Sequence, residues 1–136
     1  MVYRLFFAVA VVCFLGNLAA DIAYVLSTSL MWLHFAEWLN ATGLAFGAVA
    51  AVALLITFIA RPAFRRHAYG WTHLVVFYAA LGVELCNAFV HTADGWTAVV
   101  PAGLTLSIVG AVLALAAVGT LFALPLAWRD YREVRL

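Results

Sequence analysis

The sequence predicts an all-α integral membrane protein, an up-down bundle of four transmembrane helices with the N- and C-termini on the cytoplasmic side. Hydrophobic residues make up 68% of the 136 residues and charged residues only 10%. A chain this apolar cannot cover itself with a polar surface in water, so lipid must solvate most of it. The seven basic residues are all arginines, in three clusters separated by long apolar stretches: Arg4; Arg61, Arg65 and Arg66; Arg129, Arg132 and Arg135.

Four apolar stretches are long enough to cross a bilayer, at residues 5–26, 32–60, 70–90 and 99–128. Each supplies the roughly 20 residues that a helix needs to cross a hydrocarbon core of about 30 Å. Helices are expected because other open backbone structures would leave polar groups unpaired at this depth. The length of the chain predicts a single transmembrane domain over residues 1–136.

The connections between the four stretches are short, which favours antiparallel packing of consecutive helices. Pro62 is expected to end the second helix at Arg61, because the residue before a proline avoids helical backbone angles. Pro101 is expected in the first turn of the fourth helix, where its missing N–H costs little.

The arginine clusters predict the orientation, because basic residues concentrate on the cytoplasmic side of bacterial membrane proteins. Both termini and the middle connection are then cytoplasmic. The tryptophans fall near the predicted span ends, where aromatic belts occur: Trp32, Trp38, Trp71, Trp96 and Trp128. The acidic residues Asp21, Glu37, Glu84 and Asp94 lie away from every arginine.

A cleaved signal peptide is the alternative for the first stretch. Arg4, the apolar run and Leu18-Ala19-Ala20 resemble a processing site. Cleavage would leave three spans and break the arginine pattern, so a retained helix is expected.

Several function classes lack support in the sequence. A net charge of +1 does not suggest nucleic acid as a partner. The chain has no phosphate-binding glycine loop, nucleophile elbow or zinc-protease motif. The connections are too short to carry a catalytic apparatus, so an enzyme is disfavoured. Cys13 and Cys86 both lie in apolar runs, and no disulfide is inferred.

Ionisable and amide side chains gather toward the outward ends of three predicted helices. On the third helix, Glu84, Asn87 and His91 have the spacing of a single helix face. The neighbouring helices contribute a further set: Asn17 and Asp21 on the first, and His34, Glu37 and Asn40 on the second. Facing one another, these groups would form a polar pocket open to the outer side. Ionisable residues inside spans are costly, so they are candidates for a functional site.

Several interpretations of this pocket remain open. His34 and His91 are candidate ligands for haem b, which needs imidazoles on facing helices. Glu84 and Asn87 are candidates for proton handling or for binding a quinone. A metal site at His34 and Glu37 is less favoured, because the carboxylate-bridged bundles carry the reverse order on two helices. The plainest interpretation is interhelical hydrogen bonding with contact to headgroup water.

His73 lies near the predicted cytoplasmic end of the third helix. A lone histidine at an arginine-rich boundary is expected to contact headgroups or backbone. An axial ligand role toward a chlorophyll-type pigment stays open.

Small residues form two stripes at helical spacing, of the kind that lets membrane helices approach closely. The stripes contain Gly43, Gly47 and Ala51 on the second helix, and Gly103, Ser107, Gly110, Ala114 and Ala117 on the fourth. They could pack inside the bundle or against another protein. With no complete catalytic constellation, the leading hypothesis is a non-catalytic accessory subunit of a larger membrane assembly, for example one for electron transport. A redox carrier binding haem b or quinone is the rival hypothesis.

Several motifs resemble the bacterial membrane family called domain of unknown function 2231. They comprise WLHFAEWLNATGLAFG from Trp32 to Gly47, Gly70-Trp71-Thr72-His73, Asn87, and DGWTAVVPAGLTLS from Asp94 to Ser107. The resemblance covers nearly the whole chain and implies a four-span protein of the bacterial cytoplasmic (inner) membrane without an established reaction. It also places His73 and Asn87 on family positions. The C-terminal segment from Leu126 to Tyr131 departs from the glycine-rich ending that is frequent in this family.

Overall fold

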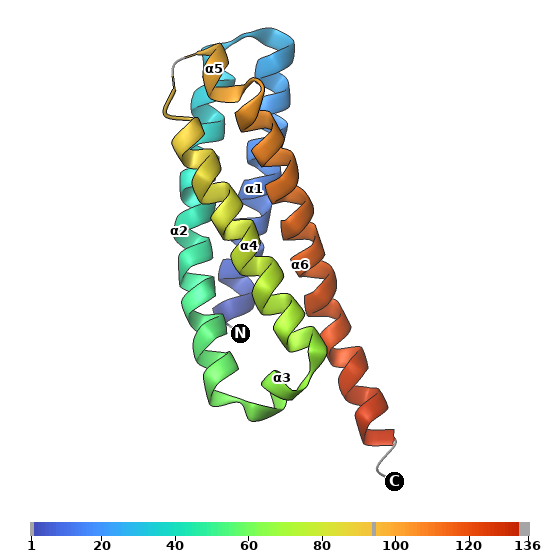
Figure 1. The fold of residues 1–136 in the computed structure, drawn as a ribbon. Helices are drawn as coiled ribbons and strands as arrows, with labels where there is room; N and C mark the ends of the chain where they lie inside the picture. Colours follow the sequence, from blue (N-terminus) through green and yellow to red (C-terminus); the bar gives the residue numbers. More distant parts are fainter. Residues whose placement is uncertain (1, 94, 134–136) are drawn as a thin grey trace.

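The computed structural model describes residues 2–93 and 95–133, and only the backbone of residues 2 and 124–133. Every regular element in this part of the chain is a helix (Figure 1). The helices are α1 (Val2–Ser27), α2 (Leu30–Ala60), α3 (Pro62–Arg66), α4 (Ala68–Val90), α5 (Trp96–Val99) and α6 (Ala102–Glu133). Four of them are long and apolar enough to span a membrane. The predicted all-α membrane fold with four spanning helices is confirmed. Asp94, Arg135 and the side chains of Trp128, Arg129 and Arg132 lie outside the described residues.

The ends of the first three spanning helices lie within three residues of the predicted ones. Arg61 ends α2 with an extended backbone, and its N–H donates to the carbonyl of Thr57. Pro62 then begins α3, where a proline needs no hydrogen-bond partner.

The start of the last spanning helix differs from the prediction. A continuous helix from residue 99 with Pro101 in its first turn was expected, but the chain forms the separate short helix α5 and begins α6 at Ala102. Val100 is extended, with φ −108° and ψ 128°. The residue before a proline is driven to such angles by the proline ring, which explains the break. Pro101 instead precedes α6, and its carbonyl accepts the N–H of Thr105 at 3.2 Å.

The connection between α1 and α2 lies at the same end of the bundle as α5, and α3 lies at the opposite end (Figure 1). We refer to these as the α5 end and the α3 end. The start of α1 is also at the α3 end. Packing is most extensive between α1 and α2 and between α4 and α6, whereas α2 and α4 pack more lightly.

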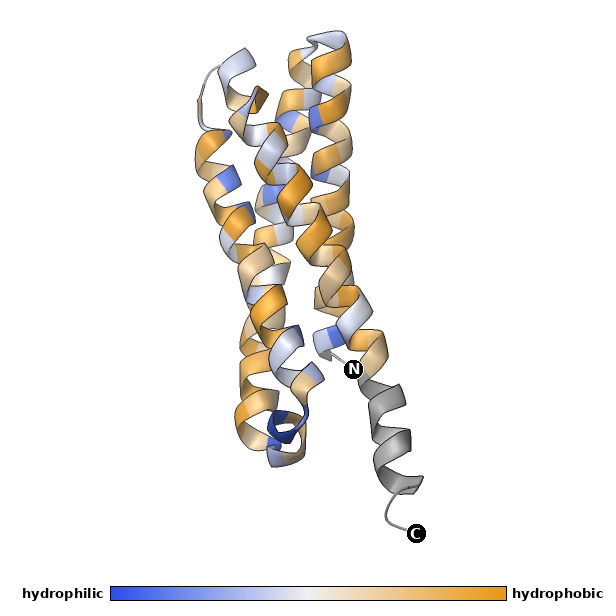
Figure 2. Ribbon diagram, turned by 45° about the vertical axis from the view of Figure 1, so that its right-hand side comes forward, coloured by the Kyte–Doolittle hydropathy of each residue, from blue (hydrophilic) through white to orange (hydrophobic). Residues whose placement is uncertain are grey.

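Aromatic and small residues form the main core of the bundle. The cluster contains Phe7, Ala10, Val11, Phe14, Ala50, Ala51, Leu54, Phe77, Ala114 and Ala117. Large apolar side chains also cover the outside, as expected for a lipid-facing surface; Leu26, for example, is 82% exposed. Figure 2 shows that apolar residues predominate along the helices, with hydrophilic residues at α3 and on the helices in the half toward the α5 end. Arg61, which precedes α3, and the α3 residues Arg65 and Arg66 are exposed.

Both stripes of small residues face the interior of the bundle. A Cβ on Gly43 would lie 2.6 Å from the ring of Phe14, and one on Gly47 would lie 2.5 Å from Leu81. On α6 each residue of the stripe is buried: Gly103, Ser107, Gly110, Ala114 and Ala117. The sequence left open whether these faces pack inside or against another protein, and the structure places them inside.

Candidate functional site

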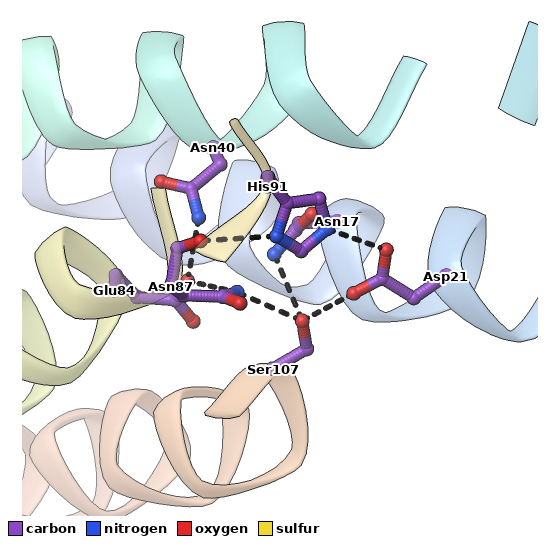
Figure 3. Close-up of polar contacts among 7 residues, drawn as sticks. All are labelled: Asn17, Asp21, Asn40, Glu84, Asn87, His91 and Ser107. Atoms are coloured by element: carbon purple, nitrogen blue, oxygen red, sulfur yellow. Dashed lines mark hydrogen bonds and ion pairs between the residues drawn. The ribbon is translucent and has the colours of Figure 1, made fainter. Parts of the chain in front are cut away.

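Seven polar residues form a buried hydrogen-bonded network in the half of the bundle toward the α5 end (Figure 3). No member is more than 3% exposed. The four spanning helices all contribute: Asn17 and Asp21 from α1, Asn40 from α2, Glu84 and Asn87 from α4, His91 directly after α4, and Ser107 from α6. We call these seven residues the polar network.

His91 and Asp21 form the ion pair of the network. Nε2 of His91 lies 2.8 Å from Oδ1 of Asp21, and Nδ1 donates to the backbone carbonyl of Asn87 at 3.0 Å. A carbonyl oxygen can only accept, and Asp21 also accepts the hydroxyl of Ser107, so both ring nitrogens act as donors. Burial by itself lowers the pKa of His91, but the hydrogen bond to Asp21 and its negative charge outweigh burial and raise the pKa above its usual value. The geometry therefore describes an imidazolium held by a carboxylate.

The hydroxyl of Ser107 is the junction of the network. It accepts the side-chain N–H groups of Asn17 at 3.2 Å and Asn87 at 2.9 Å. It donates its own proton to Oδ2 of Asp21. One hydroxyl thus connects α1, α4 and α6.

Glu84 of α4 is the second carboxyl group of the network. It lies farther from the α5 end than Asn87 and His91 do. Its Oε2 accepts from the amide groups of Asn40 at 3.1 Å and Asn87 at 3.2 Å. Its Oε1 has no hydrogen-bond partner and lies against Gly110 of α6. A Cβ at Gly110 would come within 2.6 Å of Cδ of Glu84, so the glycine makes room for this carboxyl.

The polar network contains more acceptors than its donors satisfy. Four buried oxygens have no partner: Oδ1 of Asn17, Asn40 and Asn87, and Oε1 of Glu84. The network also holds two carboxyl groups against the single cation of His91. Buried polar atoms are normally hydrogen-bonded, since an unpaired one costs about 1–3 kcal/mol. Unpaired acceptors beside an excess carboxyl indicate a place for an added proton or hydrogen-bond donor, which helix packing alone does not require.

A pocket of about 330 Å³ opens between α2 and α4 beside the network. Its lining residues are Glu37, Asn40, Ala41, Ala88, His91 and Thr92. Asn40 and His91 belong to both the pocket and the network. In Figure 3 the amide nitrogen of Asn40 points to Glu84, while its oxygen points away from the other six residues. A molecule in this pocket would therefore contact the network directly. We call it the outer pocket.

Three of the five candidate site residues come together in the network: Glu84, Asn87 and His91. His34 does not join them, because its side chain is 66% exposed and pairs with Glu37 at 3.2 Å. Both ring nitrogens of His91 already hold hydrogen bonds, which leaves neither free for iron in this arrangement. The geometry thus gives no support to haem between His34 and His91.

His73 lies at a separate site toward the α3 end, where it is fully buried. The contact with lipid headgroups that was one expectation is not formed. Its Nε2 contacts the hydroxyl of Tyr3, and its Nδ1 lies 3.0 Å from the carbonyl of Ala117 and 2.9 Å from Oγ1 of Thr120. The expected contact with backbone is confirmed, and the site links α1, α4 and α6.

Sequence reasoning missed two residues that complete the site toward the α5 end, Ser107 and Gly110. Both were assigned to the packing stripe of the fourth helix. The one available signal was the hydroxyl of Ser107 within a stripe of hydrogen and methyl side chains. Nothing in the sequence indicated that Gly110 faces Glu84.

Of three comparisons with known proteins, one gave a match, and that match is to a protein family. Neither the curated proteins nor the solved structures gave a match. Residues 5–131 match the family described as "Predicted membrane protein (DUF2231)". The match covers nearly the whole sequence and agrees with the four spanning helices, so the chain belongs to the DUF2231 family of membrane proteins.

Proposed function

We propose that this chain is a quinol-binding protein of the bacterial inner membrane, with the headgroup site in the outer pocket. The observation that carries the proposal is that the outer pocket shares Asn40 and His91 with a network containing unpaired acceptors. A quinol is uncharged, and its two hydroxyl groups are hydrogen-bond donors. It therefore supplies hydrogen-bond donors, which the unpaired acceptors of the network lack.

The charges around the outer pocket favour such a headgroup. Glu37 offers a carboxylate at the rim, and Asn40 offers a buried carbonyl oxygen without a partner. The cation of His91 is already paired with Asp21. A hydroxyl donor thus gains acceptors here, whereas an anionic group would approach the carboxylate of Glu37, which pairs only with the mostly exposed His34.

A quinol also fits the geometry better than the rival cofactor. Haem b needs free imidazole nitrogens, and those of His91 are engaged. Quinol binding needs none, because the ligand donates to oxygen atoms. Asn40 would also connect the headgroup to Glu84, because its Nδ2 donates to Oε2 of Glu84 while its Oδ1 is left to accept from the ligand.

The arginine pattern supplies the proposed orientation. Arg4 begins α1 at the α3 end, where the exposed arginines of α3 also lie. By the positive-inside rule, that end faces the cytoplasm and the outer pocket opens on the opposite side. The whole chain, 1–136, then forms one up-down domain with both termini in the cytoplasm.

The accessory-subunit hypothesis is compatible with quinol binding: the chain would bind quinol as one subunit of a larger membrane assembly. Its argument from small-residue stripes is weakened, because both stripes pack inside the bundle. Copurification tests it. We expect partner subunits to remain bound after mild detergent extraction from the native membrane, and a lone monomer there would refute the subunit role without affecting quinol binding.

Quinol binding is tested with tetramethylbenzoquinol, which has no tail, by titration calorimetry on the protein in lipid nanodiscs. We expect saturable binding by the native protein. Ala88→Phe fills the outer pocket from α4 and is expected to weaken binding at least ten-fold, or about 1.4 kcal/mol. Glu37→Gln removes a charged acceptor at the rim and is expected to weaken it by a similar factor.

Ala116→Phe is the matched control, because Ala116 is exposed on the outer face of α6. It should bind as the native protein does. No saturable binding by the native protein, or equal binding by Ala88→Phe, would refute the proposed function.

A further inference from the structure

A second pocket, of about 580 Å³, lies between the same two helices and is almost entirely apolar. Its lining residues are Leu44, Ala45 and Ala48 of α2, and Tyr78, Leu81, Gly82 and Leu85 of α4. We call it the inner pocket. It lies between the two spanning helices that pack against each other more lightly than either packs against its main partner.

The outer and inner pockets follow one line along α2 and α4. On α2 the lining positions run 37, 40, 41, 44, 45, 48; on α4 they run 78, 81, 82, 85, 88, and residues 91 and 92 directly after α4 continue the series. Steps of three and four keep residues on one helix face, so each helix presents a single stripe to both pockets. From 37 to 48 this stripe covers roughly 16 Å of helix at 1.5 Å per residue.

Small side chains keep this line open. Ala41, Ala45 and Ala48 line it on α2, and Gly82 and Ala88 line it on α4. A Cβ on Gly82 would meet no atom within 4 Å, so the glycine borders open space and is not required for close helix packing. The stripes at Gly43, Gly47 and Gly110, by contrast, are in tight contact.

The deeper end of the line is bounded by a hydrogen bond between the helices. The hydroxyl of Tyr78 donates to the backbone carbonyl of Ala51 at 2.9 Å. The line thus has acceptors at the α5 end, an apolar middle and a closed inner end. This order of polar and apolar surfaces matches a ligand with a small polar head and one apolar tail.

We propose that the two pockets form a single groove that holds a quinol with an isoprenoid tail, its ring in the outer pocket and its tail in the inner pocket. This inference rests on the proposed function and adds the tail site. A phospholipid fits the outer pocket less well, because its phosphate would lie beside Glu37 while the only cation lining the pocket, His91, is neutralised by Asp21.

The test compares a benzoquinol carrying a decyl tail with tetramethylbenzoquinol, using calorimetry in nanodiscs of one lipid composition. Gly82→Leu places a side chain in the inner pocket and leaves the outer pocket intact. We expect it to weaken binding of the tailed quinol about ten-fold and to leave the tailless quinol unchanged. Comparing variants in the same nanodiscs cancels the partition of the tailed quinol into lipid.

Ala45→Phe fills the same pocket from α2 and serves as the second variant, should Gly82→Leu fold poorly. Gly119→Leu is the control, because a Cβ on Gly119 also meets no atom within 4 Å, but on the outer side of α6. It should bind both quinols as the native protein does.

The outcomes separate the two proposals. If the native protein and both inner-pocket variants bind the tailed quinol equally, while Ala88→Phe binds neither quinol, the tail site is wrong and the headgroup site stands. If the native protein binds neither quinol, the proposed function fails as well. Copurified phospholipid that is lost in Gly82→Leu, with no change in quinol affinity, would assign the inner pocket to a lipid and overturn the inference.

Discussion

His91→Leu is expected to lower the free energy of unfolding by about 3–5 kcal/mol, the usual loss when one partner of a buried ion pair is removed. The carboxylate of Asp21 is fully buried and would keep only the hydroxyl of Ser107 as a donor. The backbone carbonyl of Asn87 would also lose its side-chain donor.

Asp21→Asn should cost much less, although it alters the same pair. An asparagine can accept the Ser107 hydroxyl and donate to Nε2 of a neutral His91, whose Nδ1 still donates to Asn87. Neutral hydrogen bonds between membrane helices are worth about 0.6 kcal/mol on average. The loss is therefore expected to be within about 1 kcal/mol.

The pair also predicts a pH dependence of stability. Burial acts to lower the pKa of His91, but the Asp21 contact prevails, with smaller support from the Asn87 carbonyl and the charge of Glu37, so the folded pKa is raised. A raised pKa means that the folded state holds this proton more tightly than the unfolded state does. The stabilisation is fully present below the ordinary histidine pKa and is lost as the pH rises through the folded value. In Asp21→Asn this dependence should disappear.

These expectations are checked by SDS titration of the folded protein in mixed micelles, repeated between pH 6 and pH 9. His34→Leu is the control, because this histidine is mostly exposed and pairs only with Glu37. If His91→Leu is as stable as the native protein, or if the Asp21→Asn variant keeps the pH dependence, the buried ion pair is refuted.

Gly110→Ala is expected to lower the free energy of unfolding by about 1–3 kcal/mol, the range for overpacking a filled interior. Its added methyl group would meet Cδ of Glu84 at 2.6 Å and Cγ at 3.1 Å. These atoms are close to the backbone of α4. Relief therefore requires either the separation of α4 from α6 or a new Glu84 rotamer that breaks the bonds to Asn40 and Asn87.

A double-mutant cycle identifies Glu84 as the cause. With Glu84→Ala in place, the space beside residue 110 is free, so adding Gly110→Ala should cost little and the two changes should couple favourably. Gly119→Ala is the matched control on the same helix, where the methyl group meets nothing and alanine is a better helix former. Strict additivity of Gly110→Ala and Glu84→Ala in the same SDS titration would contradict the proposed contact.

Patterns within single helices were enough to predict the four spans and the shared face of Glu84, Asn87 and His91. Spacing along one helix decides which side chains share a face, and hydropathy decides which segments need lipid. The break between α5 and α6 was also encoded locally, in Pro101, but the last spanning helix was predicted to begin at residue 99, three residues before its observed start at Ala102.

Partners on different helices were harder to predict, because they depend on how each helix is rotated about its axis. Ser107 has the spacing of a packing stripe, and only the rotation of α6 brings it to Asp21. The same rotation places Gly110 against Glu84. His34 shows the opposite error: it lies one turn from Glu37, at a plausible depth, yet α2 turns it outward. Tyr3 and Thr120 became partners of His73 for the same reason.

The apolar core cluster has an electrical consequence. Phe7, Phe14 and Phe77 belong to this cluster, which lies between the polar network and His73 along α1 and α4. A proton that reaches Glu84 from the outer pocket would cross only part of the transmembrane field and stop at this aromatic layer. Moving a full charge across the membrane is worth about 2.3 kcal/mol per 100 mV, so occupancy of Glu84 would respond to a fraction of the voltage. The bundle would then behave as a capacitor, storing displaced charge on one side and carrying no steady current.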